Sequence, residues 1–372
     1  MGDLKLYVGT YTQQVSSRIQ STGVGITVLD YDTSTGALSQ VQQLPGIENP
    51  SYLAVSPDGR VLHAVSETED GQVMSYEIDY DTGHLSLIGS QSSRGARPCY
   101  VAMDSRARAA FVSNYKSGSV AMFPIRADGS LAEATSFVQH NGMGPDTVRQ
   151  AGPHAHCVVV APTDDHAFVA DLGADAIFGY ALDYEHFEMV PHARLNLMPG
   201  SGPRHLVFDP QGRLAFVINE LDSTLAGLAY DAENGTLKAV ASLPTVPDSF
   251  GNENLCADIQ VHPLGEFVYC SNRGHDSIAM YRVNQETGRL RLLGYRSTEG
   301  KGPRNFKISP DGRRLLVANQ DSNNIVTLEI DVESGIIGET VSVAVVARPV
   351  CMAFSATHAS ATGATLDQPR SK

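Results

Sequence analysis

The sequence predicts an all-β fold, a seven-bladed β-propeller with four antiparallel strands per blade, from two observations. First, a short unit returns seven times: a run of small apolar residues that ends in a polar residue, as in FVADLG and FVINEL. Successive copies are separated by roughly 50 residues, which is typical of propeller blades. Second, no long window has the periodicity of an amphipathic helix. The polar residues that we take as equivalent are Thr10, Glu67, Asn114, Asp171, Asn219, Asn272 and Asn319.

The repeat between Gly202 and Val240 shows how one blade is built. Its turns, DPQG and DAENG, are rich in the residues that supply the special backbone angles of hairpins. These turns separate apolar runs of strand length. The strands are expected over residues 205–208, 214–218 and 225–230, with a fourth from Leu237 onward. Four antiparallel strands are what a propeller blade requires.

The two ends of the chain are predicted to complete one blade together. Residues 4–44 supply three strands but lack the first strand of the repeat, and a matching strand is expected at 349–354. A blade made from both termini would close the ring and leave no open sheet edge. We therefore expect one propeller domain over residues 1–355. The small polar residues of 356–372 predict a disordered tail.

Composition limits the classes of partner. With 27 Lys and Arg against 41 Asp and Glu, the net charge is −14. Nucleic acids and anionic membranes need a basic surface, so neither is expected as the main partner. A small anionic ligand in a locally basic pocket stays compatible. The N-terminus lacks the pattern of a signal peptide, and no window approaches a membrane span. Five cysteines without a C-x-x-C spacing predict reduced thiols in a cytoplasmic protein.

Two rings of equivalent positions are predicted to meet at the axis, on the face opposite the turns. Just before the first strand the ring reads Ser51, Cys99, His156, Arg204, Ala257, Arg304 and Val350. Just after the second strand it reads Tyr11, Thr68, Tyr115, Leu172, Glu220, Arg273 and Gln320. The ionisable members fall mainly on consecutive blades: His156, Arg204, Glu220, Arg273 and Arg304. A symmetric fold does not require this asymmetry, so we interpret the cluster as a functional site.

The cluster predicts acyl-oxygen chemistry on a small anion. Arginine forks suit carboxylate or phosphate oxygens, and they can stabilise the oxyanion of an attacked ester carbonyl. A histidine such as His156 suits proton transfer near neutral pH. A carboxylate beside arginines, such as Glu220, can polarise a water or accept a proton. Together these groups fit a sugar-acid lactone, or the reverse type of step in which a carboxylate closes onto a double bond.

Structural interpretations stand beside these functional ones. Arg204 and Arg304 can pair with carboxylates at blade edges, and Glu220 can be such a partner. The further candidates for substrate contact are His154, His205, Tyr115 and Asp171, of which Asp171 can instead cap its loop.

Several other chemistries lack a motif. There is no G-x-S-x-G elbow of a serine hydrolase and no H-E-x-x-H or zinc cysteine pair. His154 and His156 belong to a predicted strand start and do not by themselves make a metal site. We expect neither a cofactor nor a metal.

Five short motifs carry a resemblance to a known family. They are GPHAH from Gly152, GPRH from Gly202, NEL from Asn219, NR from Asn272 and GPRNF from Gly302. In this order they resemble the lactonase family of seven-bladed propellers, from about Leu6 to Phe354. The family's proposed active-site set of histidine, arginine, glutamate and a second arginine falls on His156, Arg204, Glu220 and Arg273.

The resemblance implies a cofactor-independent hydrolase of six-carbon sugar lactones, most often the 6-phosphate, 6-phospho-D-glucono-1,5-lactone. Ala155 and Cys157 depart from residues common in the family and leave the choice of lactone open. Three alternatives stand: a lactonase for unphosphorylated aldonic or aldaric lactones, a muconate-type cycloisomerase, and a non-catalytic propeller that scaffolds proteins. The sequence also leaves open whether His156 or Glu220 is the base, and whether the chain forms a homo-oligomer.

Overall fold

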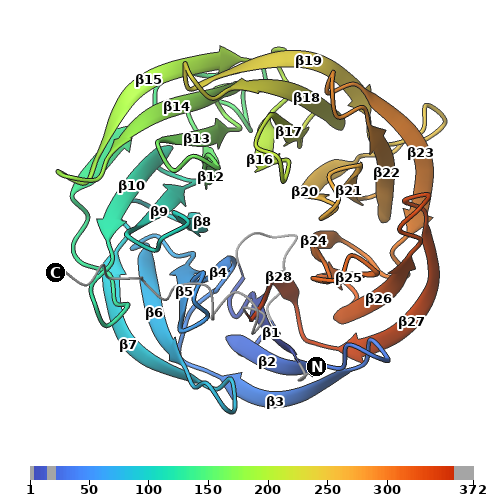
Figure 1. The fold of residues 1–372 in the computed structure, drawn as a ribbon, viewed down its shortest axis with the longest axis horizontal. Helices are drawn as coiled ribbons and strands as arrows, with labels where there is room; N and C mark the ends of the chain where they lie inside the picture. The colour runs from blue at the N-terminus through green and yellow to red at the C-terminus, as the bar shows by residue number, and fades with distance from the viewer. Residues whose placement is uncertain (1–3, 15–21, 356–372) are drawn as a thin grey trace, which may run out of the picture.

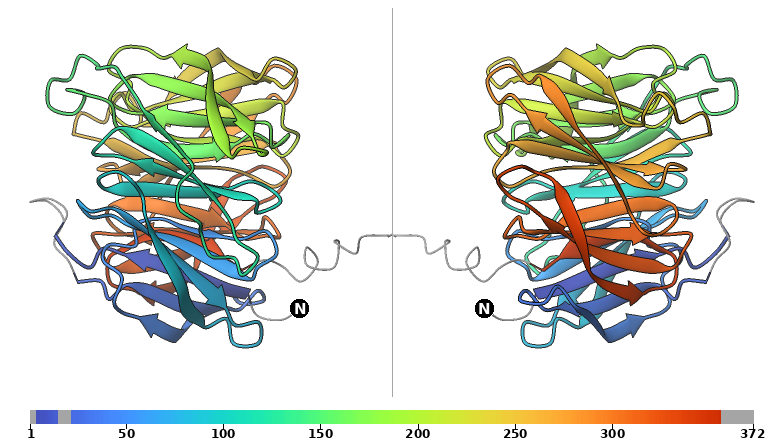
Figure 2. Two further views of the ribbon diagram at one scale, coloured as in Figure 1. Left: turned by 90° about the vertical axis from the view of Figure 1, so that its left-hand side faces the viewer. Right: turned by 90° about the vertical axis from the view of Figure 1, so that its right-hand side faces the viewer.

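Seven four-stranded antiparallel sheets surround one central axis in the computed structural model, which describes residues 4–14 and 22–355 (Figure 1). The predicted seven-bladed propeller is confirmed. Helices are absent from the described part of the chain. The side views show the strands running between two faces of a thick disc, with the loops at those faces (Figure 2). Our prediction for the tail over 356–372 lies outside the described residues.

Each blade places its first strand next to the axis and its fourth strand at the rim. The first three blades consist of β4 (Leu53–Val55), β5 (Val61–Ser66), β6 (Gln72–Ile78) and β7 (Leu85–Ser92); β8 (Pro98–Met103), β9 (Ala109–Asn114), β10 (Ser119–Pro124) and β11 (Ser136–Gln139); and β12 (Ala155–Val160), β13 (His166–Asp171), β14 (Ala176–Asp183) and β15 (Glu188–Asn196).

The next three blades repeat this order. They consist of β16 (Pro203–Phe208), β17 (Leu214–Asn219), β18 (Thr224–Asp231) and β19 (Thr236–Pro244); β20 (Leu255–Val261), β21 (Phe267–Arg273), β22 (Ser277–Val283) and β23 (Leu290–Ser297); and β24 (Pro303–Ile308), β25 (Arg314–Asn319), β26 (Asn324–Ile330) and β27 (Ile337–Val345).

The last blade joins the two ends of the chain, as predicted. It consists of β28 (Pro349–Phe354), β1 (Leu4–Thr10), β2 (Ile26–Tyr31) and β3 (Leu38–Leu44). Strand β28 pairs antiparallel with β1, with Leu6 opposite Phe354 and Val8 opposite Met352. The sheet ladder therefore has no break at the chain ends, and apolar side chains between neighbouring blades form the core.

The register of the second strands corrects one equivalence. The backbone N–H of Tyr115 donates to the carbonyl of Arg97 at 2.9 Å, and that of Glu220 to Gly202 at 2.7 Å. The N–H of Glu67 makes the same bond, to Asn49 at 3.1 Å. Glu67 is thus equivalent to Tyr115 and Glu220.

Our placement of Glu67 with Asn114, and of Thr68 in the axial ring, was therefore wrong by one residue. Ser66 ends β5 and pairs with Gln72, whereas Asn114 ends β9 and pairs with Ser119. The turn after β5 is one residue longer than the turn after β9, and this length difference shifted the alignment.

Candidate active site

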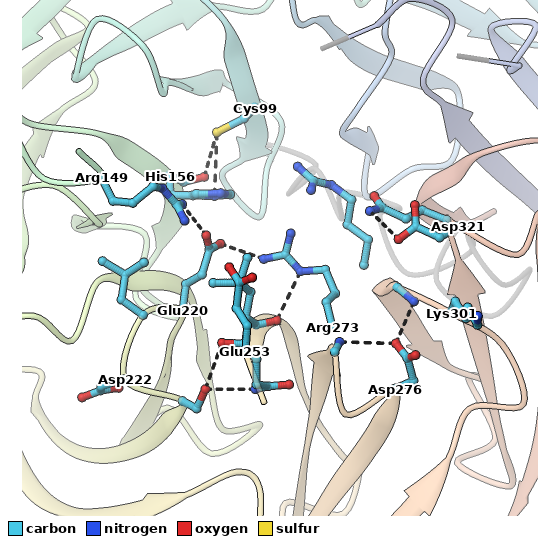
Figure 3. Close-up of a pocket in the computed structure, with 18 of the residues that line it drawn as sticks. Cys99, Arg149, His156, Glu220, Asp222, Glu253, Arg273, Asp276, Lys301 and Asp321 are labelled. Carbon is cyan, nitrogen blue, oxygen red and sulfur yellow. Dashed lines mark hydrogen bonds and ion pairs between the residues drawn. The ribbon is translucent and has the colours of Figure 1, made fainter. Parts of the chain in front are cut away.

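A cavity of about 1150 Å³ lies on the axis, at the face where first strands begin and second strands end. It collects members of both predicted rings, which the fold brings together as expected. The ring residues that line it are Tyr11, Glu67, Cys99, Tyr115, His156, Glu220, Arg273, Arg304 and Gln320. Figure 3 shows several of these side chains converging.

The first ring reaches the axis through irregularities in the sheet. Between β12 and β13 the register skips His156, between β16 and β17 it skips Arg204, and between β24 and β25 it skips Arg304. Each is the unpaired residue of a β-bulge, a device that re-aims a side chain while the ladder continues on both sides. Cys99 is skipped in the same way between β8 and β9. The bulges explain why Cys99, His156 and Arg304, and not their neighbours in the chain, line the cavity.

Three arginines surround the carboxylate of Glu220. Arg204 Nε lies 3.0 Å from Oε2, Arg273 Nη2 lies 2.9 Å from the same oxygen, and Arg149 Nη2 contacts Oε1. Figure 3 shows Glu220 between Arg149 and Arg273. Arg204 does not line the cavity itself; it is 2% exposed and also donates to the carbonyl of Ala257. Arg204 therefore contacts Glu220 from the buried side, away from the cavity.

The arginines determine the charge of Glu220. Burial alone would raise the pKa of this carboxyl, but the charges of Arg273, Arg204 and Arg149 outweigh burial and lower the pKa to about 2. Glu220 is therefore an ionised carboxylate at neutral pH, and it is a weak base.

His156 lies beside this group on β12, with its side chain buried. Its Nδ1 is 3.8 Å from Sγ of Cys99, and the edge of its ring meets the Tyr115 ring at 5.4 Å between centroids. Burial, followed by the charge of Arg204, lowers the pKa of His156 well below 6.5. The imidazole is therefore neutral near pH 7 and can accept a proton.

Three predicted contact residues do not line the cavity: His154, His205 and Asp171. Nδ1 of His154 lies 2.9 Å from the carbonyl oxygen of Tyr115, and the two rings stack at 4.5 Å. Nδ1 of His205 lies 2.8 Å from Asp258. Asp171 accepts a hydrogen bond of 2.7 Å from the backbone N–H of His154. These contacts are those of positioning residues. Of the four further residues predicted to contact substrate, Tyr115 lines the cavity.

Arg304 lies on the other side of the cavity, and its pairing differs from that of the arginines around Glu220. Its guanidinium lies over the ring of Tyr11, 5.2 Å from the centroid. Unlike Arg204 and Arg273, it forms no hydrogen bond or ion pair with any residue in the described ranges. Lys301, on the loop before β24, also lines the cavity and has no ion pair within the described part of the chain. These two cations are available to an anionic ligand.

Sequence reasoning missed three residues of the site, Arg149, Glu67 and Lys301. Arg149 lies between β11 and β12, in a segment that has no counterpart in the other repeats. The long interval between Asn114 and Asp171 signals that insertion, although it does not say which residue turns inward. The one-residue alignment error after β5 hid Glu67.

In the described ranges, no group of three or more His, Cys, Asp or Glu side chains is arranged to hold a metal ion. No helix in residues 4–14 and 22–355 is long and apolar enough to cross a membrane. All five cysteines are buried and free.

The comparisons with known proteins agree with the fold. The family model described as lactonase, 7-bladed beta-propeller, matches residues 5–354. The chain therefore belongs to the lactonase family of seven-bladed propellers, and the resemblance seen in the sequence is confirmed.

Particular relatives carry more specific names. The 6-phosphogluconolactonase of Bacillus subtilis is 36% identical over 351 residues, which cover 94% of this chain and 97% of that protein. The structure of the periplasmic gluconolactonase PpgL of Pseudomonas aeruginosa has a TM-score of 0.88 at 33% identity, covering 95% of this chain and 99% of that one. A putative 6-phosphogluconolactonase from Bacteroides fragilis has a TM-score of 0.86 at 32% identity, covering 95% and 98%.

Proposed function

We propose that this protein hydrolyses a sugar-acid lactone, with 6-phospho-D-glucono-1,5-lactone as substrate and 6-phosphogluconate as product. One observation carries the proposal: a neutral, buried His156 stands beside the arginine-bound Glu220 in a cavity that also holds two available cations. The names of the relatives from Bacillus subtilis and Pseudomonas aeruginosa support lactone chemistry.

In this proposal His156 is the base. It accepts a proton from the water that attacks C1 of the lactone, because its imidazole is neutral and lines the cavity, whereas both carboxylate oxygens of Glu220 are held by arginines. Glu220 is too weak a base, since three arginines stabilise its charge. Its role is to fix Arg273 at the cavity wall, where the guanidinium stabilises the oxyanion that forms on the carbonyl oxygen.

The 6-phosphate is assigned to Arg304 and Lys301. The sequence suggested Arg204 and Arg273 for this task as well, but both are held by Glu220. Guanidinium and ammonium groups without a partner are suited to a phosphate dianion.

A second candidate substrate is the unphosphorylated glucono-1,5-lactone. The gluconolactonase name of the Pseudomonas aeruginosa structure favours it, and so does the acidic lining of the cavity by Asp146, Glu253, Asp276 and Asp321. A single comparison separates the two candidates, because Arg304 matters only for the phosphorylated lactone.

The test follows acid release from freshly made lactones by pH-stat, with spontaneous hydrolysis subtracted. Arg304→Ala is expected to lower kcat/KM for the 6-phosphate by roughly 10- to 100-fold, the effect of losing a charge-assisted contact, and to change the unphosphorylated lactone little. Arg60→Ala is the matched control, because Arg60 is exposed and pairs with Asp58 in a turn at the far end of β4 and β5. A wild-type protein that releases acid from no lactone overturns the proposed function and leaves the cycloisomerase or scaffold alternatives.

Free, buried thiols fit a reducing compartment, so the cytoplasm is our proposed location. Fractionation of the source cells tests it.

A further inference from the structure

Glu67 is the second glutamate of the axial ring. It occupies the same register position as Glu220, and the strands that precede the two residues, β5 and β17, lie on opposite sides of the ring (Figure 1). Glu67 lines the cavity and is 8% exposed. Two carboxyl groups therefore face one cavity from opposite walls.

The surroundings of Glu67 differ from those of Glu220. The Tyr11 hydroxyl donates a hydrogen bond of 3.0 Å to Oε2 of Glu67. No ion pair joins Glu67 to any residue within 4–14 or 22–355, and the nearby Arg304 lies over the Tyr11 ring instead. Burial raises the pKa of Glu67, against the opposing charge of Arg304. Glu67 therefore retains a proton more readily than a carboxyl in water does, while Glu220 is fully ionised.

Opening a lactone requires such a proton. The ring oxygen leaves C1 as an alkoxide, a strong base, unless an acid protonates it. Neighbours of Glu67 are poor donors: burial raises the pKa of Tyr11 and of the Cys99 thiol, and a guanidinium such as Arg304 stays charged. On this wall of the cavity Glu67 is the side chain suited to the task. Separate acid and base carboxyl or imidazole groups with divergent environments are a recurring arrangement in enzymes.

We propose that Glu67 is the catalytic acid, which protonates the ring oxygen as the lactone opens, and that Tyr11 is its positioning residue. The inference rests on the proposed lactonase function. Water oxygen forms the new bond to C1, and its proton passes to His156. The bond between C1 and the ring oxygen then breaks, and that oxygen takes the proton of Glu67. The product acid and the imidazolium release their protons to solvent, from which Glu67 is reprotonated.

The test compares Glu67→Gln with wild type. Glutamine keeps the shape and can still accept the Tyr11 hydrogen bond, but it cannot act as an acid. With 6-phospho-D-glucono-1,5-lactone we expect kcat to fall about 100-fold or more, the usual contribution of general acid catalysis. Glu266→Gln is the control: Glu266 is a partly exposed glutamate that pairs with Arg282 at 3.2 Å and does not line the cavity. Its kcat is expected to stay at the wild-type level.

A second substrate separates acid catalysis from a structural role. In the analogue with sulfur as the ring atom, the leaving thiolate needs no protonation, so Glu67→Gln and wild type are expected to turn it over at similar rates. The pH dependence of kcat gives an independent readout. Wild-type kcat is expected to decline as rising pH deprotonates Glu67, and the variant is expected to lack this decline.

Two results overturn the proposal while leaving the lactonase function standing. One is wild-type kcat in Glu67→Gln, which would mean that the His156 imidazolium returns the proton to the ring oxygen itself. The other is an equal loss with the oxygen and sulfur lactones together with an unchanged pH profile, which would mean that Glu67 only shapes the cavity. Failure of the wild-type protein to hydrolyse any lactone overturns both proposals together.

Discussion

The two walls of the cavity carry similar residues, but the arginines around Glu220 on one wall are paired and Arg304 on the other is unpaired among the described residues. On the first wall, Arg149, Arg204 and Arg273 each form an ion pair with the single carboxylate of Glu220, so every arginine has a partner and a net positive charge remains. On the second wall, Arg304 has no ion pair with a described residue, and Oε1 of the buried Gln320 accepts no hydrogen bond in the described part of the chain. The first wall is therefore fixed before a ligand arrives, and the second has donors and acceptors that a ligand can satisfy. In our proposals the preorganised charges of the first wall serve the attack on C1, and the second wall holds both the acid Glu67 and the cations that bind the phosphate.

The largest effect on kcat is expected from removing the Arg204 side chain from the first wall. Arg204→Ala removes a buried partner of Glu220 and is expected to lower kcat by about 100- to 1000-fold. Loss of a buried ion-pair partner also destabilises, by roughly 3–5 kcal/mol. Turnover by pH-stat and thermal unfolding followed by circular dichroism check the two effects. Unchanged turnover in this variant would contradict the assignment of the first wall to the chemistry.

The next effect concerns His156 and its pH dependence. His156→Gln is expected to lower kcat by about 100-fold, because the base is lost. In the wild type the neutral imidazole is the active form, and its pKa is depressed. Activity should therefore persist below pH 6.5 and fall only when the pH approaches the lowered pKa. The acidic limb of the kcat profile should be missing from the variant; a limb that survives would point to another base.

A smaller effect is expected on the second wall from Tyr11→Phe. This change removes the hydrogen bond to Glu67 and keeps the ring under Arg304. One hydrogen bond contributes about 1 kcal/mol, so kcat is expected to fall roughly fivefold, less than in Glu67→Gln. Steady-state kinetics of the two single variants and the double variant measure the coupling. Fully additive losses would show that Tyr11 does not act through Glu67.

The smallest expected effect is on the pH dependence of folding stability, and the two glutamates contribute to it with opposite signs. Glu220 has a lowered pKa in the folded protein, so its contribution is present above the unfolded pKa and is lost as pH falls. Glu67 has a raised pKa, so folding becomes less favourable as rising pH ionises it. Glu67→Gln is therefore expected to raise Tm relative to wild type more at neutral than at acidic pH. A pH-independent difference in Tm would argue against a raised pKa.

The sequence predicted the parts of the site that follow the repeat. His156, Glu220, Arg273 and Arg304 line the cavity because they occupy equivalent positions in successive blades. Arg149 was not predicted because it lies in the insertion between β11 and β12, which has no equivalent segment in the other repeats to align with. His205 lies next to Arg204 in the chain, but its ring is buried between the Arg204 guanidinium and Asp258 and does not line the cavity.

The bulges at the start of the first strands have a consequence for how such a site can change. Cys99, His156, Arg204 and Arg304 each stand outside the ladder of their blade, so replacing one of them alters the axis without breaking a strand pair. The side chains at these positions can therefore be exchanged while the hydrogen-bonded strands stay the same. Substituting them one blade at a time offers a direct route to variants of the propeller with altered lactone preference.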